Sequence, residues 1–132
     1  MSNRINVSSG VKWEDIIGYS RAVRVDNIIE VAGTTALDET GNLVGADNPY
    51  EQTKYIIMKI EKALIKVGAT LNDIVRTRIF TTDISHWEEI GRAHGEFFRE
   101  IKPASTMVEV KSLINPAMLV EIEATVIVQE NL

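Results

Sequence analysis

The chain has 132 residues, and its 45% hydrophobic and 25% charged residues are typical of one globular domain and exclude a disordered chain. It has no cysteine, which excludes disulfides, thiolate metal sites and a cysteine nucleophile. The net charge of −5 disfavours nucleic acid as a partner, and no apolar run reaches the ~20 residues of a membrane span. Residues 1–10 are polar and lack the apolar stretch of a signal peptide, so we expect a single cytoplasmic domain over residues 1–132.

Alternating apolar and polar residues predict strands in the first part of the chain. The segments Tyr19–Val25 and Ile28–Ala32 lie on either side of Asp26 and Asn27, a pair typical of a two-residue hairpin turn. A further turn over residues 38–41 precedes a short predicted strand near Leu43. Three strands are therefore expected before the first helix.

The first predicted helix has a start signal, a buried face and an end signal. Asn48 can cap its N-terminus, Pro49 suits the first helical position, and Gly68 suits the residue just beyond its end. Its apolar residues recur with the helical period of 3.6, at Ile56, Ile57, Ile60, Ala63, Leu64 and Val67.

The second predicted helix begins at Ser85, which has the capping-box spacing to Glu88, and ends before Pro103. Its apolar face consists of Trp87, Ile90, His94, Phe97, Phe98 and Ile101. His94 is thus either a core or interface histidine or a catalytic group.

Three later segments also alternate like strands: Ile74–Thr81, Thr106–Leu113 and Val120–Val128. The predicted order is β-β-β-α-β-α-β-β. This is an α+β fold in which both helices cover one face of a mixed sheet.

The opposite face of the predicted sheet combines charged and large apolar side chains. It would carry Arg76, Arg78, Phe80, Met107, Glu109, Lys111, Glu121, Glu123 and Ile127. Such a face is either exposed to water or packed against another subunit, and its interspersed apolar side chains favour association.

Glu121 and Glu123 on this face are two residues apart. Adjacent carboxylates can raise the pKa of one member and form an acid/base pair, or they can be neutralised by Arg76 and Arg78. The two arginines can also bind an anionic ligand such as a carboxylate. The pattern alone leaves these alternatives open.

Four motifs resemble those of a known family. They are YSRAV (19–23), VAG (31–33), PASTMVEV (103–110) and VEIEA (120–124). With this order of elements, the chain resembles the Rid family of reactive-intermediate deaminases, also called YjgF or L-PSP endoribonuclease-like proteins. The resemblance implies a chorismate-mutase-like fold and a homotrimer with a central barrel and three clefts between subunits.

The resemblance also implies an activity, which is the hydrolysis of imines and enamines to 2-keto acids and ammonia without a cofactor. Glu121 matches the glutamate that positions or activates water, and Tyr19 and Gly33 match residues of the cleft. Ser105, Thr106 and Met107 fall at substrate-binding positions of the same motif.

The chain departs from the family at four cleft positions. Ser105 replaces the arginine that holds the substrate carboxylate, Met107 replaces a cysteine, Ala32 replaces a serine and Gly91 replaces an asparagine. A neutral hydroxyl in place of a guanidinium forfeits a charge-assisted hydrogen bond of about 1.5–3 kcal/mol.

The loss of the arginine leaves three hypotheses. The first is a deaminase with an altered substrate, in which Ser105 and Thr106 bind a smaller or less anionic molecule. Arg76 or Arg78 of the neighbouring strand is an alternative substitute for the arginine, and His94 is a further candidate residue of the cleft. The second is a noncatalytic trimer that binds a small metabolite. The third is a ribonuclease or translation inhibitor, which the acidic charge and the lack of a basic stripe disfavour.

Overall fold

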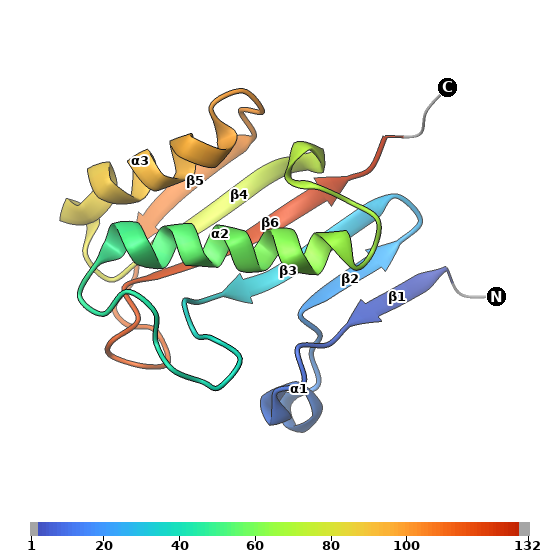
Figure 1. Cartoon of the computed structure of the whole chain (residues 1–132), viewed down its shortest axis with the longest axis horizontal. Coiled ribbons are helices and arrows are strands. Elements are labelled where there is room, and N and C mark those ends of the chain that lie inside the picture. Colours follow the sequence, from blue (N-terminus) through green and yellow to red (C-terminus); the bar gives the residue numbers. More distant parts are fainter. Residues whose placement is uncertain (1–2, 130–132) are drawn as a thin grey trace.

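The computed structural model describes residues 3–129 and arranges the strands of this segment in one six-stranded mixed sheet (Figure 1). The strands are β1 (Arg4–Val7), β2 (Ala22–Val25), β3 (Ile28–Thr34), β4 (Ile74–Thr81), β5 (Ala104–Glu109) and β6 (Val120–Ile127). The α-helices are α1 (Lys12–Ile17), α2 (Pro49–Ile65) and α3 (Trp87–Phe98). The strand order is β1-β2-β3-β6-β4-β5, and only β4 and β5 are parallel, since α3 connects them as a crossover.

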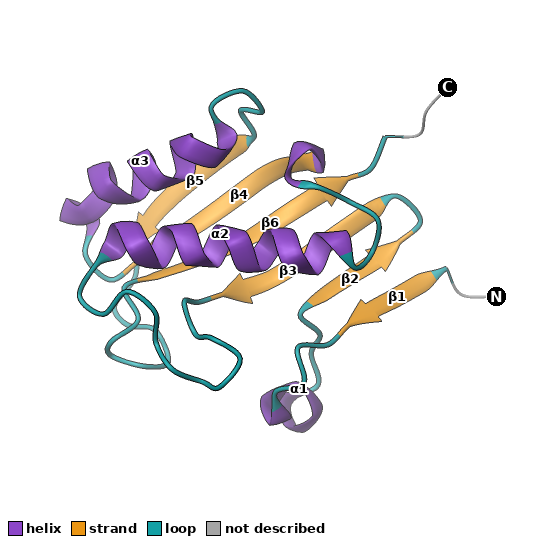
Figure 2. Cartoon of the chain, in the orientation of Figure 1, coloured by secondary structure: helices purple, strands orange, loops and turns teal. Residues whose placement is uncertain are grey.

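Helices α2 and α3 lie on the same face of the sheet, whereas α1 lies beyond one end of it (Figure 2). The core between helices and sheet contains Ile56, Ile57, Ile60 and Leu64 of α2 and the inward-facing residues Val120, Ile122, Ala124 and Val126 of β6. The predicted α+β fold, with two helices on one sheet face, is confirmed. None of the helices in residues 3–129 has the length and apolar character needed to cross a membrane.

Local signals placed the first hairpin and the first helix correctly. Asp26 has a φ of 54°, as a two-residue hairpin turn requires. The Asn48 side chain accepts a hydrogen bond from the Glu51 amide, and Pro49 is the first residue of α2. Gly68 follows the helix with a φ of 80°.

The predicted strand near Leu43 is wrong. Leu43 forms only an isolated bridge to Leu37 within a loop. The third strand of the N-terminal part is instead β1, which pairs with β2. Both β1 and α1 went unpredicted, because four and six residues are too few to display a clear period.

The start of α3 also differs from the prediction. A short 3-10 turn, Ile84–His86, precedes the helix, and Asp83 caps this turn by accepting hydrogen bonds from the Ser85 amide and hydroxyl. The α-helix itself starts after His86 without a side-chain cap, so Ser85 is not its capping residue. Trp87 at the start of α3 is 56% exposed and lies outside the core, whereas Ile90 and Phe98 are buried as expected.

Three residues lie on the opposite sheet face from the one predicted: Val75, expected beside Thr77 and Ile79 under the helices, and Met107 and Glu109, expected on the helix-free face. Glu109 pairs with the buried Thr81 and accepts a hydrogen bond from the Ile84 amide on the helix side. A bulge in β4 shifts the register between Ile74 and Arg76, so Val75 is exposed while Ile74 is buried. Met107 pairs in register with Ile79 and packs on the core, because β5 is parallel to β4. The strand holding Met107 spans 104–109 rather than 106–113.

Candidate functional site

A cavity of about 470 Å³ lies where the N-terminal ends of β2 and β6 meet the C-terminal end of β3. Antiparallel pairing makes these ends neighbours, since Ala22 pairs with Val31 and Thr34 with Ile122. Side chains just beyond the paired residues therefore converge. The cavity lining includes Tyr19, Arg21, Gly33, Lys59 and Glu121.

Glu121 lies directly against Gly33. A Cβ atom added at Gly33 would be 2.9 Å from the Glu121 carboxyl carbon, so only glycine leaves room for this side chain where it stands. Burial raises the pKa of Glu121, nearby Arg21 lowers it, and Glu123 raises it further, with a net upward shift. A raised pKa brings the proton exchange of this carboxyl closer to neutral pH.

Two cations that the sequence motifs did not single out also line the cavity. The Arg21 guanidinium donates to the Gly33 carbonyl at 2.5 Å, and the Lys59 ammonium donates to the Thr35 carbonyl at 2.7 Å. Burial, and then the nearby charge of Arg21, lower the pKa of Lys59 to about 8. Arg21 could have been identified from the sequence, because it lies two residues after Tyr19 in the YSRAV motif.

Tyr19 is positioned by the end of α1. Gly18 adopts a φ of 90° at the end of this helix, and the Tyr19 amide donates to the Glu14 carbonyl at 3.0 Å. The Glu14 carboxylate in turn accepts from the amide and the hydroxyl of Ser9. Helix α1 thus fixes the tyrosine at the cavity.

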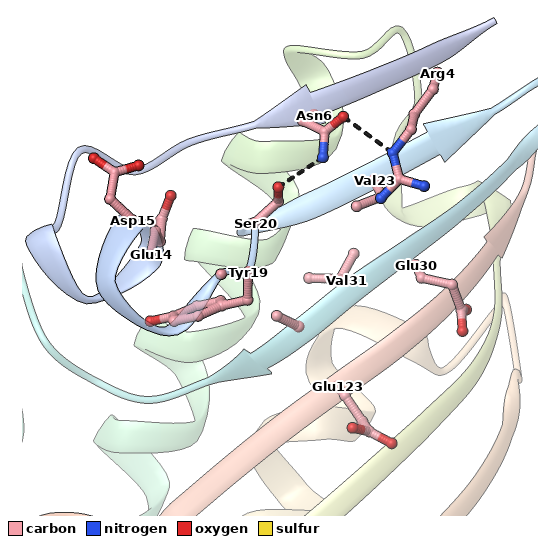
Figure 3. Close-up of a pocket in the computed structure, with 12 residues that line it drawn as sticks. Arg4, Asn6, Glu14, Asp15, Tyr19, Ser20, Val23, Glu30, Val31 and Glu123 are labelled. Carbon is pink, nitrogen blue, oxygen red and sulfur yellow. Dashed lines mark hydrogen bonds between the residues drawn. The ribbon is translucent and has the colours of Figure 1, made fainter. Parts of the chain in front are cut away.

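Tyr19 also borders a second, more open hollow on the helix-free face of the sheet, which Figure 3 shows. There Asn6 joins two neighbours, accepting from Arg4 at 3.2 Å and donating to the Ser20 hydroxyl at 2.8 Å. Glu123 lines this hollow and not the cavity of Glu121. Glu121 and Glu123 of β6 therefore line two different hollows.

The three β5 positions lie away from Glu121. The Thr77 hydroxyl donates to the Ser105 hydroxyl at 2.8 Å and lies 2.9 Å from His94 Nε2. Burial lowers the pKa of His94, which favours the neutral ring that donates to Thr77 through Nε2–H. Ser105 thus faces α3, while Thr106 is exposed beside Arg78 and Met107 packs on the core.

The remaining sequence candidates also lie outside the cavity. Arg78 forms an ion pair with Glu123 at 3.4 Å, so this arginine neutralises one of the paired glutamates. Arg76 has a buried Nε without a hydrogen-bond partner, and neither arginine lines the cavity of Glu121. Gly91 is an exposed residue of α3, and a Cβ added there would meet nothing within 4 Å.

Metal-ligating side chains are not clustered in the described part of the chain. No group of three or more His, Asp or Glu residues among residues 3–129 is arranged to hold an ion.

The sequence model of the endoribonuclease L-PSP family matches residues 11–128. The chain belongs to this family. Its YjgF-type fold is also confirmed by a Mycobacterium tuberculosis member of the YjgF/YER057c/UK114 family, which is 48% identical, covers 95% of this chain and 99% of its own, and superposes with a TM-score of 0.86.

Two further family relatives agree with this assignment. A RutC family protein of Pyrococcus abyssi is 40% identical over 107 residues, which cover 80% of this chain and 83% of the relative. A Rid-family protein of unknown function from Yersinia pestis is 30% identical, with a TM-score of 0.81 and coverage of 93% of this chain and 94% of its own. The Rid family named from the sequence motifs is thereby confirmed.

Proposed function

We propose that this Rid-family chain hydrolyses a reactive imine or enamine to a carbonyl compound and ammonia, without a cofactor. The observation that carries the proposal is the grouping of Glu121, Gly33 and Tyr19 at one cavity. These are the residues that match the family cleft, and Glu121 has the raised pKa that proton transfer needs.

In the proposed reaction Glu121 is the catalytic residue. Its carboxyl orients a water molecule whose oxygen bonds to the imine carbon, and one water proton passes through the carboxyl to the imine nitrogen. The resulting carbinolamine gives its hydroxyl proton to the nitrogen through the same carboxyl. The carbon–nitrogen bond then breaks, and ammonia leaves as the carbonyl forms. The Tyr19 hydroxyl can donate to the substrate beside this carboxyl.

The proposed assembly is a homotrimer with sites at the clefts between subunits. The helix-free sheet face supports association, because Ile28, Val108 and Ile127 expose apolar surface there next to charged side chains. Ser105 lies too far along the sheet to line the cavity of Glu121 in its own chain, so a neighbouring chain would have to supply it. Sedimentation equilibrium should give three times the chain mass, and a monomer would contradict this part of the proposal.

The activity is tested by generating imines in solution with an amino-acid dehydratase or oxidase and following their decay. We expect the wild type to accelerate decay over buffer and Glu121→Gln to lose about 10²-fold or more of that rate. Glu30→Gln is the matched control, since it removes an exposed carboxylate from β3 and should keep the wild-type rate. No acceleration with any of several amino-acid precursors would overturn the proposal.

Noncatalytic binding of a small metabolite is the second candidate. It is favoured by Ser105, whose neutral hydroxyl bonds to Thr77 where the family has a substrate-binding guanidinium. Thermal-shift measurements with 2-keto acids and related metabolites separate the two candidates, since a binder is stabilised by a ligand that it does not turn over.

A further inference from the structure

The cavity holds two cationic side chains whose charged groups are brought together by one short segment. Arg21 bonds to the Gly33 carbonyl and Lys59 to the Thr35 carbonyl, and these carbonyls are two residues apart at the end of β3. Arg21 comes from the residue before β2, and Lys59 from the middle of α2. The two charged groups are close enough for the charge of Arg21 to lower the pKa of Lys59.

Neither of these cations is in a direct ion pair within the described part of the chain, although buried charges are usually paired. Arg21 Nε is buried without a hydrogen-bond partner, and the ion pairs found within residues 3–129 include neither Arg21 nor Lys59. The charges of Glu14 and Glu121 act on Arg21 and that of Asp38 acts on Lys59, but none of these carboxylates is in direct contact with either cation. Both cations can therefore still donate directly to a negatively charged ligand, through Arg21 Nε among other groups.

The surroundings favour a singly charged carboxylate over a phosphate. A guanidinium matches the planar geometry of a carboxylate with two parallel hydrogen bonds. The carboxyls of Glu14 and Glu121 already act on Arg21 by their charge, so a ligand with two negative charges would be repelled more strongly than one with a single charge.

We propose that Arg21 and Lys59 together bind the carboxylate of a small ligand in this cavity, in place of the guanidinium that Ser105 does not supply. That this ligand is the imine substrate rests on the proposed function, whereas carboxylate binding does not. The carbon next to the bound carboxylate then lies toward Glu121, on the same cavity wall as Gly33.

The test is calorimetric titration of the whole protein with pyruvate, pyruvamide and inorganic phosphate, which needs no turnover. Pyruvamide has the shape of pyruvate without its charge. The variants are Lys59→Met, with Lys59→Gln as a second replacement, and Lys59→Arg to retain the charge. Lys54→Met is the matched control, because Lys54 is on the same helix but stacks over Tyr50 outside the cavity. Thermal melting establishes that each variant is folded.

We expect wild type, Lys59→Arg and Lys54→Met to bind pyruvate with the same affinity. We expect Lys59→Met and Lys59→Gln to bind it with an affinity lower by about 10-fold or more. Pyruvamide and phosphate should bind the wild type more weakly than pyruvate. Equal binding of pyruvate by wild type and the two neutral variants would overturn the proposal, as would equal binding of pyruvate and pyruvamide or no binding of pyruvate. Failure of imine hydrolysis alone would refute only the proposed function.

Discussion

Replacing Gly33 with alanine places a methyl group against the Glu121 side chain. The new Cβ would be 2.9 Å from the carboxyl carbon and 3.1 Å from Oε2, whereas ordinary contacts begin near 3.4 Å. The carboxyl must therefore move away by about 0.5 Å or more, while the backbone at this position tolerates alanine. Since a misplacement of ~1 Å can cost 100-fold in rate, we expect imine hydrolysis to fall by about 10- to 100-fold.

The assay is imine decay measured beside urea unfolding of the same preparations. Gly33→Ala should leave the free energy of unfolding within about 1 kcal/mol of the wild type, because the clash involves the end of one side chain. The control is Gly95→Ala in α3, where a Cβ meets nothing; it should stabilise the protein by about 0.5–1 kcal/mol and retain the rate. A folded Gly33→Ala variant with an unchanged rate would refute the placement of Glu121 as the catalytic group.

Four further predictions concern charge, hydrogen bonding and the altered motif. Because the pKa of Glu121 is raised in the folded state, this carboxyl costs stability as pH rises through that pKa, so Glu121→Gln should raise Tm at pH 7 and not at pH 4; equal shifts at both would contradict this. Pyruvate binding to the wild type should weaken as pH rises through about 8, where Lys59 loses its proton, and a flat profile would count against Lys59. Thr77→Val should cost about 1–3 kcal/mol in urea unfolding, since it leaves the half-buried His94 ring without its partner, and no loss would show that ring to be satisfied elsewhere. Ser105→Arg should increase hydrolysis of carboxylate-bearing imines by about 10-fold, as a charged fork replaces a neutral donor; an unchanged rate would mean that position 105 does not reach the ligand.

The elements that the sequence predicted well are those specified by neighbouring residues. Asp26 and Asn27 define a turn by themselves, and Asn48 with Pro49 defines the start of α2. The alternation of β6 likewise needs no other element, and its buried residues are those that the pattern indicates. Local chemistry was sufficient in each case.

The errors arose where a second element decides the outcome. Met107 belongs to a strand of mixed residues, and only its parallel pairing with Ile79 of β4 places it on the core. The bulge that exposes Val75 is a property of the β4–β6 pair and leaves no mark in β4 alone. The edge strand β1 is defined by its pairing with β2.

The candidate site was predictable only in part, for the same reason. The motifs indicated Tyr19, Gly33 and Glu121, and all three line one cavity. Arg21 and Lys59 were not predicted, since an arginine before a strand and a lysine on a helix are ordinary surface residues until the fold places the ends of β2 and β3 beside the middle of α2. Their convergence is a product of the tertiary fold.

A crystal structure of the protein with pyruvate bound tests the roles of Glu121, Arg21 and Lys59 most directly. We expect the pyruvate carbonyl carbon to lie within about 3.5 Å of a Glu121 carboxyl oxygen, with the pyruvate carboxylate at Arg21 and Lys59. Pyruvate bound instead in the open hollow between Arg4 and Glu123 would contradict these roles, because no residue assigned to the chemistry would then reach the reacting carbon.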